Sequence, residues 1–383
     1  MPLKKQLSKP LLNWYDAHRR DLPWRGIRDP YAIWLSEVML QQTTVRAVEP
    51  RWTRFLKRWP TAAALANAPL ADVLQEWTGL GYYARARNLH RAAGIIRDQF
   101  GGAIPPAFEL LLALPGMGVY TAAAVASIAF GEAVAVVDAN VERVLARLFA
   151  IEENIRTTPM RKKLREHVAD LLDRKRPGDY NQAIMELGAT ICLPRKPRCP
   201  ECPIASWCEA RKRGIQETVP VIPAKTPMQK VRESAVIIRD RKGRVLLLLR
   251  AMESSFGGMW ETPRAVCGEH EEARAAAGRA ATEIAGLSVS VGAPALRLRH
   301  TVMRNQITLT VFGVTSVKGK VRLSAQHDDH RWATTEEWLT MPKSTTQADI
   351  AEFVATGNLP AKSVTAEDTG ERDFFSDEGN SPN

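Results

Sequence analysis

The feature that most constrains this chain is a turn bracketed by glycines at residues 114–118, which leads into an apolar helix and then to an isolated aspartate, Asp138. Pro115 ends the helix before the turn. Gly116 and Gly118 permit positive φ angles and a close backbone approach, so the first amides of the next helix can face an anion. We expect the turn to receive a phosphate, and the alternative is an ordinary connection between two helices.

Asp138 follows the apolar run 133–137 and directly precedes the amphipathic segment 141–148. A short polar residue at this place commonly caps a helix, and that remains an alternative to a chemical role. The turn from Leu114 to Gly118, followed by Asp138, resembles the helix-hairpin-helix superfamily of DNA glycosylases. The resemblance implies that Leu114, Gly116 and Gly118 form a DNA-binding hairpin and that Asp138 is catalytic.

Glu37 lies among large apolar residues in the segment Trp34 to Leu40, within a helix expected over 31–42. Removal from water raises the pKa of a carboxyl group, so such a residue can hold a proton near neutral pH. This is the profile of a general acid. The alternative is a glutamate on the solvated face of an amphipathic helix.

Aromatic and basic residues alternate after the Gly-Leu-Gly turn at 79–81, where Tyr82 precedes Arg85 and Arg87. An exposed tyrosine can wedge between stacked bases while arginines hold phosphates, as expected where a nucleotide is flipped out of a duplex. Tyr83 and Leu89 fit a hydrophobic core equally well.

The segments Trp34 to Thr43 and Trp77 to His90, together with the hairpin, resemble the MutY-type adenine DNA glycosylases over most of residues 10–215. This resemblance implies that Glu37 is the acid and Asp138 its partner carboxylate. It also implies that Gln42 and Tyr82 wedge into DNA.

The same resemblance implies that Tyr120 and Asn140 support the site near the sugar. Related endonuclease III-like enzymes carry a catalytic lysine at the position of Tyr120. Without that amine no Schiff base forms, so simple hydrolysis of the base is expected.

Four cysteines form a compact loop with the spacing Cys192-x6-Cys199-x2-Cys202-x5-Cys208. Four thiolates suit either zinc or an iron–sulfur cluster, and the spacing alone leaves both metals open. The loop resembles the 4Fe-4S loop of endonuclease III and MutY-type proteins, which implies a 4Fe-4S cluster with a structural role. Cys267 lies outside the loop.

The C-terminal part contains β-rich runs at 234–238 and 244–249, the stretch Gly-Gly-Met-Trp-Glu-Thr-Pro, a helix expected over 269–284 and further strands at roughly 297–315. This part resembles the Nudix fold. Its catalytic box aligns best with residues 279–286, but Ala280 and Ile284 stand where that box carries metal-binding glutamates. A hard divalent cation needs several oxygen ligands, so we expect a binding module rather than a pyrophosphate hydrolase.

The lesion-reading loop of many MutY-type enzymes contains Phe-Ser-His after a His-Thr-like pair, and this chain departs from that pattern. His300-Thr301 is followed by Val302-Met303-Arg304-Asn305. Our hypothesis is that Arg304, with Asn305, supplies polar contacts to 8-oxoguanine in place of the missing groups. The alternative is that Met303 and Arg304 only form a strand turn.

The distribution of charged residues indicates what kind of molecule the chain binds. The net charge is +11, and the whole excess lies in residues 1–225, which hold 33 Lys and Arg against 22 Asp and Glu. A basic surface beside a phosphate-type hairpin indicates nucleic acid. No apolar run reaches the length of a membrane span. We therefore expect a monomer in the bacterial cytoplasm, associated with the nucleoid when bound to double-stranded DNA that contains an adenine mispair.

The predicted fold is multidomain. A mostly α helix-hairpin-helix glycosylase region of two intertwined lobes, with its iron–sulfur loop, precedes an α+β Nudix-like domain. We expect these regions at 1–218 and 232–345, joined by a linker at 219–231 and followed by a disordered tail at 362–383.

The predicted function is that of a monofunctional glycosylase that removes adenine paired with 8-oxoguanine or guanine. The rival hypotheses are an endonuclease III-like lyase, a non-catalytic iron–sulfur DNA-binding protein and a DNA-tethered Nudix hydrolase.

Overall fold

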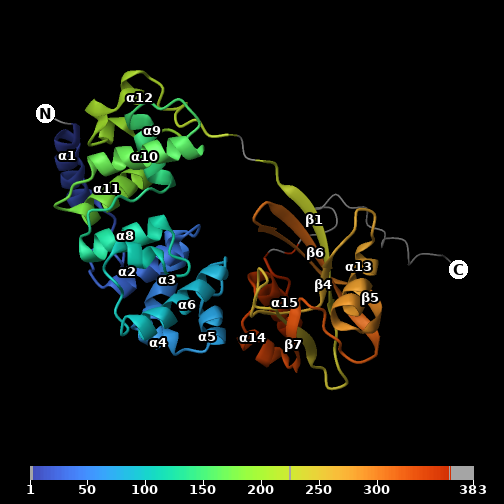
Figure 1. Ribbon diagram of the computed structural model, residues 1–383. Coiled ribbons are helices and arrows are strands. Elements are labelled where there is room, and N and C mark those ends of the chain that lie inside the picture. Colours follow the sequence, from blue (N-terminus) through green and yellow to red (C-terminus); the bar gives the residue numbers. More distant parts are fainter. Residues whose placement is uncertain (1–2, 224–225, 362, 364–383) are drawn as a thin grey trace. The chain divides into compact units, whose positions relative to one another are not determined.

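The computed structural model describes residues 3–223, 226–361 and 363. Contacts divide the chain into two compact units (Figure 1). The first consists of Met1–Ala68 and Arg85–Lys225, and the second of Pro69–Ala84 and Thr226–Asn383. The first unit is helical and the second combines sheets with helices, so the predicted fold class is confirmed.

The first unit is built from helices joined by short loops. Its helices are α1 (Leu3–His18), α2 (Pro30–Leu40), α3 (Val45–Arg58), α4 (Ala62–Ala66), α6 (Ala84–Gln99), α7 (Phe108–Leu112), α8 (Val119–Phe130), α9 (Ala139–Leu148), α10 (Thr158–Leu171), α11 (Pro177–Thr190) and α12 (Glu209–Lys212), with 3-10 turns η1 (Cys199–Glu201) and η2 (Ala205–Trp207). Helix α5 (Leu70–Glu76) is grouped with the second unit.

One hydrophobic core of the first unit joins the N-terminal helix to helices that come more than a hundred residues later. Leu11 and Tyr15 of α1 pack in one cluster with Val141 of α9 and Leu187 of α11. Helices α2, α3, α4, α6, α7 and α8 form the other group of the first unit (Figure 1). Because the chain leaves the first group after α1 and returns to it at α9, the two helical lobes are intertwined.

Helix α2 is apolar on nearly every side, and this explains why it lies in the interior. Asp29 caps its amino end by accepting from the Tyr31 amide at 2.9 Å, and Pro30 occupies the first turn, where a missing amide hydrogen costs nothing. All nine residues from Tyr31 to Met39 are buried. A carboxyl group within this run is therefore buried by its own helix.

The second unit contains two sheets. Its elements are β1 (Gln229–Ile237), β2 (Val245–Arg250), β3 (Trp260–Glu261), β4 (Arg264–Val266), α13 (Ala273–Ala285), β5 (Ser288–Val302), β6 (Asn305–Lys318), β7 (His327–Ala333), α14 (Thr335–Thr340) and α15 (Thr345–Thr356). The four-stranded sheet has the order β4-β1-β6-β5, and the three-stranded sheet the order β3-β2-β7. Strands β1 and β6 are parallel, and the other neighbours are antiparallel.

Alternate residues of the strands feed two separate cores. Ala235 and Ile237 pack with Trp338 of α14 and Ile350 of α15, whereas Val236 packs with α13 on the opposite face. This alternation is the two-residue period of a strand that is buried on both faces. Helix α13 covers one side of the sheets, and α14 and α15 cover the other.

Several observed boundaries differ from the expected ones. Strand β1 begins at Gln229, inside the segment expected as a linker, and Val219 is buried in the core of the first unit. Helix α13 begins at Ala273 rather than at residue 269. The tail expected at 362–383 lies outside the described residues, apart from Ser363.

Candidate active site

The first unit contains a cavity of about 270 Å³ that brings together the four residues expected to act on the nucleotide. Glu37 comes from α2, Tyr120 from α8, and Asp138 and Asn140 from the start of α9. These residues are up to 103 positions apart in the sequence, yet all four line one cavity. Apolar side chains, including Trp24 and Ile128, complete its wall.

Glu37 is only 7% exposed, so it is buried as expected, and the alternative of a solvated helix face is wrong. The Tyr120 hydroxyl donates a hydrogen bond to Glu37 Oε2 at 2.8 Å. Burial raises the pKa of Glu37, and the Tyr120 hydrogen bond and the charge of Arg25 oppose that rise only partly. Because Oε2 accepts from Tyr120, the acidic proton of Glu37 is expected on Oε1.

Asp138 is both the cap of α9 and a wall of the cavity, so its role as a cap does not remove it from the site. Its Oδ1 accepts from the Val141 amide at 2.7 Å, and its Oδ2 accepts from the Asn140 side-chain amide at 2.8 Å. Burial raises the pKa of Asp138, while these hydrogen bonds lower it. Both oxygens are fixed, which leaves the carboxyl group with one orientation.

A second polar group in the cavity was not anticipated from the sequence. Glu186 of α11 accepts from Arg20 at 2.9 Å and from Arg25 at 3.0 Å, and Arg25 also donates to Gln182 Oε1 at 2.6 Å. Burial acts to raise the pKa of Glu186, but the hydrogen bond from Arg20 and the charge of Arg25 hold it below its usual value. This part of the cavity therefore carries an ionised carboxylate with its counter-charges.

The signal for Glu186 was present in the sequence. It lies in Ala183-Ile-Met-Glu-Leu-Gly-Ala, where a carboxylate stands among apolar residues just as Glu37 does. Its arginine partners come from positions 20 and 25, more than 160 residues away, in a turn with no periodic pattern.

The cysteine loop is connected to the cavity through one arginine. Arg143 of α9 donates to Asn140 Oδ1 and to the Gly188 carbonyl, both at 2.8 Å, and to the Cys192 carbonyl at 2.7 Å. Asn140 in turn donates to Asp138. A chain of hydrogen bonds therefore connects the cysteine loop to the side chain that fixes Asp138.

The four loop cysteines line one small apolar-walled cavity. Arg147, which is buried, donates to Cys192 Sγ at 3.3 Å and to the Leu193 carbonyl at 2.6 Å. Burial raises the pKa of Cys202 to about 12, so this thiol is protonated at neutral pH until a metal displaces its proton. Within the described ranges, no three His, Cys, Asp or Glu residues are grouped closely enough to hold a single metal ion.

The hairpin joins α7 to α8, as the sequence predicts, but its two glycines differ. Gly116 has φ of 75°, in the left-handed region, whereas Gly118 has φ of −74° and serves as the cap of α8. An added Cβ at Gly118 would meet nothing within 4 Å. Leu114 is buried, so its side chain belongs to the interior and only the backbone of the turn is available to a phosphate.

Both residues expected to enter the duplex adopt backbone conformations that are rare outside glycine. Gln42 has φ of 56° and is exposed, and Tyr82 has φ of 49° with 48% of its surface exposed. Non-glycine residues persist in this region only where the surroundings hold them, and such positions cluster at functional sites. Tyr83 and Leu89 are buried, as the core alternative predicts.

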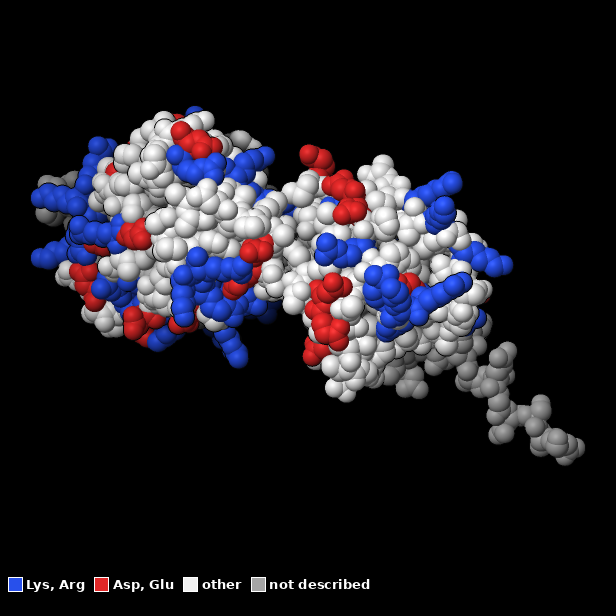
Figure 2. All heavy atoms as spheres, turned by 90° about the horizontal axis from the view of Figure 1, so that it is seen from below, with Lys and Arg blue, Asp and Glu red and all other residues white. Residues whose placement is uncertain are grey.

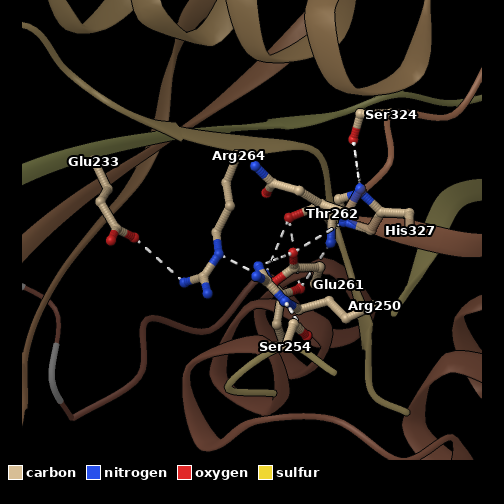
Figure 3. Close-up of polar contacts among 10 residues, drawn as sticks. Glu233, Arg250, Ser254, Glu261, Thr262, Arg264, Ser324 and His327 are labelled. Atoms are coloured by element: carbon tan, nitrogen blue, oxygen red, sulfur yellow. Dashed lines mark hydrogen bonds and ion pairs between the residues drawn. The ribbon is translucent and has the colours of Figure 1, made fainter. Parts of the chain in front are cut away.

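The Gly-Gly-Met-Trp-Glu-Thr-Pro stretch of the second unit supplies the centre of a buried polar network (Figure 3). Glu261 pairs with Arg250 at 2.8 Å, with Arg264 at 3.0 Å and with His327 at 3.2 Å. Burial acts to raise the pKa of Glu261, but the charge of Arg264 and the bond to His327 outweigh it and lower that pKa to about 2. This motif therefore stabilises the domain.

The helix that resembles the Nudix box carries no set of metal ligands. Ala280 is fully buried, and Ile284 packs against the core. Arg279 is paired with Glu271 at 2.8 Å and with Glu283 at 3.2 Å. The glutamate that remains in the box is thus neutralised by the arginine of the same box.

The loop expected to read the lesion is a tight hairpin turn between β5 and β6. Met303 and Arg304 form the turn, and both are exposed. Met303 has φ of 54° and is 79% exposed. The turn is compatible with both hypotheses for this loop, and it leaves the side chains of Met303 and Arg304 at the surface.

Basic side chains cover much of the visible face of the helical unit in Figure 2, with acidic side chains between them. This agrees with the charge excess of residues 1–225. No helix within the described residues is long and apolar enough to span a membrane.

Family models match three parts of the chain. Residues 35–170 match the HhH-GPD superfamily of base excision DNA repair proteins, residues 192–208 the iron–sulfur binding domain of endonuclease III, and residues 234–352 the NUDIX domain. The loop 192–208 is therefore an iron–sulfur binding loop.

Curated relatives from mammals, a plant and bacteria are all named adenine DNA glycosylase. Adenine DNA glycosylase of Homo sapiens is 36% identical over 400 residues, covering 89% of this chain and 72% of the human protein. The chain belongs to the adenine DNA glycosylase family. The family member from Mycolicibacterium smegmatis is 43% identical over 244 residues, covering 63% of this chain and 79% of its own length. A solved thermostable thymine-DNA glycosylase has a TM-score of 0.51 and 32% identity, and it covers 55% of this chain and 97% of its own.

Proposed function

We propose that this protein removes adenine paired with 8-oxoguanine or guanine in double-stranded DNA, by hydrolysis of the N-glycosidic bond in base excision repair. The observation that carries the proposal is the placement of two carboxyl groups with different surroundings in one cavity, Glu37 against a tyrosine hydroxyl and Asp138 against two amide donors. Membership of the adenine DNA glycosylase family supports the choice of base.

The chemistry follows from the two surroundings. Glu37, protonated because burial raises its pKa, donates its proton to a ring nitrogen of the flipped-out adenine. The glycosidic bond then breaks, and its electron pair leaves with the neutral base. Asp138 in its ionised form stabilises the positive charge that develops on the sugar, as the second carboxylate does in glycoside hydrolysis. Water adds to the sugar carbon and loses a proton, which leaves an abasic site.

Two neighbours support these roles. Tyr120 orients Glu37 through its hydrogen bond to Oε2, and Asn140 orients Asp138. Tyr120 has no amine, so an imine with the sugar cannot form at this position and the enzyme is monofunctional. Trapping of a covalent adduct by borohydride is expected to stay far below that of a lyase.

We propose that the iron–sulfur loop holds a 4Fe-4S cluster through Cys192, Cys199, Cys202 and Cys208. The four thiols line one cavity, and four cysteine thiolates are the ligand set of such a cluster. The cluster, when bound, ties the loop into one rigid unit. Arg195, Lys196 and Arg198 of that loop can then contact the DNA backbone.

The remaining DNA contacts are assigned by element. The amides at Gly116 and Gly118 bind a phosphate at the amino end of α8. Gln42 and Tyr82, exposed and held in left-handed conformations, enter the base stack. The first unit contains the glycosylase region, and the second contains the domain that reads the lesion, with Arg304 as its polar contact at the exposed turn. The protein acts as a monomer on the DNA of a bacterial cytoplasm.

A glycosylase assay tests the proposal. Purified protein is incubated with duplexes that carry adenine opposite 8-oxoguanine, guanine or thymine, and alkali then cuts each abasic site. We expect cleavage after alkali opposite 8-oxoguanine and guanine, little opposite thymine, and none without alkali. Release of a pyrimidine instead, or strand cleavage without alkali, would identify an endonuclease III-like activity. Absence of base release from every duplex would leave a DNA-binding protein.

The contribution of Arg304 is tested by the ratio of rates opposite 8-oxoguanine and guanine. We expect this ratio to fall in Arg304→Ala and to fall further in a chain truncated after Lys225. An unchanged ratio in Arg304→Ala with a collapsed ratio in the truncated chain would mean that other residues of the C-terminal domain read the lesion.

A further inference from the structure

Arg85, at the start of α6, is bound to the chain itself, although its sequence context suggested a phosphate contact. It comes three residues after Tyr82. Its guanidinium donates to four acceptors in the segment where α2 ends: the carbonyls of Val38 and Met39 at 2.8 Å, the carbonyl of Gln41 at 2.6 Å, and the hydroxyl of Thr43 at 3.0 Å.

These contacts complete a helix end that lacks its own support. The last carbonyls of a helix have no partner within the helix, and they carry a partial negative charge that favours a cation. The last turn of α2 contains no basic residue. Arg85 supplies that charge from another helix. A planar guanidinium reaches several acceptors at once, which the single ammonium group of a lysine does less well.

The segment that Arg85 holds contains one residue of the proposed DNA wedge and adjoins the proposed acid. Gln42 lies between two of the acceptors and keeps φ of 56° while its side chain is exposed. Gln41 anchors the same segment from the other side, because its amide donates to Thr121 of α8 at 2.9 Å. Glu37 belongs to the last turn of α2, directly before Val38.

We propose that Arg85 is a positioning residue for base extrusion: it holds Gln42 in the exposed left-handed conformation in which its side chain can enter the duplex. The strained backbone of Gln42 needs such support, because an unsupported residue would relax to an ordinary φ. In this role Arg85 acts through Gln42 and touches neither the base nor the sugar. The inference rests on the proposed function, because it concerns the same adenine.

The experiment measures extrusion apart from chemistry. All variants are made in a Glu37→Gln background, and the duplex carries 2-aminopurine in place of adenine opposite guanine, so fluorescence at saturating protein reports the unstacked fraction. We expect the extrusion equilibrium constant to fall about tenfold in Arg85→Gln, as for loss of hydrogen bonds from a charged donor, with partial recovery in Arg85→Lys. The control is Arg97→Gln on the same helix, whose guanidinium pairs with Asp98, and it should stay within about twofold of the parent.

A double variant separates positioning from general stability. If Arg85 acts through Gln42, adding Arg85→Gln to Gln42→Ala should lower extrusion no further than Gln42→Ala alone. The inference would be overturned if the double variant lowered the extrusion constant by the product of the two single effects. It would also be overturned if extrusion in Arg85→Gln equalled that in Arg97→Gln. If Arg85→Gln does not fold, the same comparisons are made with Arg85→Lys.

The wild-type glycosylase assay keeps the two ideas apart. Failure of wild-type protein to release adenine, with the extrusion pattern intact, would refute the proposed function and leave the role of Arg85 standing. Release of adenine by wild type together with unaffected extrusion in the Arg85 variants would refute only the inference about Arg85.

Discussion

The two glycines of the hairpin should respond differently to substitution by alanine: Gly116→Ala should lose stability, and Gly118→Ala should lose DNA affinity. Gly116 has φ of 75°, and a Cβ added there would lie 2.7 Å from the Cβ of Asn88 on α6. Gly118 has φ of −74°, which any residue adopts, and an added Cβ would meet nothing within 4 Å. Alanine at either position adds one methyl group, so the two variants differ in backbone conformation and in neighbouring atoms but not in added volume.

The structure gives the size of each effect. A left-handed conformation costs a non-glycine residue about 1–2 kcal/mol, and the overlap with Asn88 adds a further cost of about 1–3 kcal/mol, because a Cβ can move only with its backbone. We therefore expect Gly116→Ala to lower the free energy of unfolding of the helical unit by about 2–5 kcal/mol. Gly118→Ala should change that stability by less than about 1 kcal/mol, because alanine restricts the unfolded chain but is a poorer helix cap than glycine.

DNA affinity should distinguish the two variants as well, with a loss in Gly118→Ala that does not come from instability. Stability is measured by urea denaturation followed by far-UV circular dichroism, and affinity by titration of a duplex that carries an abasic-site analogue. Gly118→Ala should fold normally yet bind DNA more weakly, because its methyl group stands where the backbone approaches the phosphate. Equal stability of the two variants would refute the assignment of strain to Gly116. Unchanged affinity in Gly118→Ala would refute the phosphate contact.

Three further outcomes are expected. Glu37→Gln should lower the single-turnover rate of adenine release by about 10²–10⁴-fold while duplex affinity is retained. In wild type the rate should fall as the pH rises through the elevated pKa of Glu37. A normal rate in Glu37→Gln would contradict the role of Glu37 as the acid. Glu261, whose pKa is about 2 in the folded protein against an ordinary value of 4.5, should contribute about 3 kcal/mol to the free energy of unfolding above pH ~4.5, and this contribution should be lost as the pH falls toward ~2. The difference in unfolding midpoint between wild type and Glu261→Gln should narrow over this range, and a constant difference would argue against the contribution. In anaerobically purified protein, Cys199→Ser should lower the iron content well below the roughly four atoms per chain expected for wild type. Cys267→Ser should leave the iron content unchanged. Zinc in place of iron in the wild type would refute the cluster.

The sequence predicted most of what depends on local pattern. The apolar run around Glu37 predicts a buried carboxyl group, and the structure contains one. The position of Asp138 before an amphipathic segment predicts an N-cap, which is also present. The spacing of the four cysteines predicts one metal-binding loop, and their side chains line one cavity. In each case, the residues that determine the environment lie close in the sequence.

What the sequence did not reveal depends on partners that folding brings from far away. Arg85 was expected to face phosphate, but α2 ends beside it with unsatisfied carbonyls, and nothing in residues 79–91 encodes that neighbour. Glu186 acquires its charged partners from a turn at positions 20–25. Gly118 is the same residue type as Gly116 but has a different conformation and different surroundings, since only Gly116 lies against Asn88. Composition and periodicity constrain an element, whereas such contacts depend on how the elements pack.

The division of labour between the two carboxyl groups follows from where their helices begin and end. Burial raises the pKa of both Glu37 and Asp138. Asp138 lies at the amino end of α9, where the helix dipole favours negative charge, and it accepts two hydrogen bonds from amide donors. Glu37 lies in the last turn of α2, where the dipole disfavours negative charge, and accepts one hydrogen bond, from Tyr120. We therefore expect Asp138 to ionise first as the pH rises, and its charge in the same cavity acts to keep the proton on Glu37. Between the two ionisations the site holds one acid and one anion, the combination that departure of a base from a sugar requires.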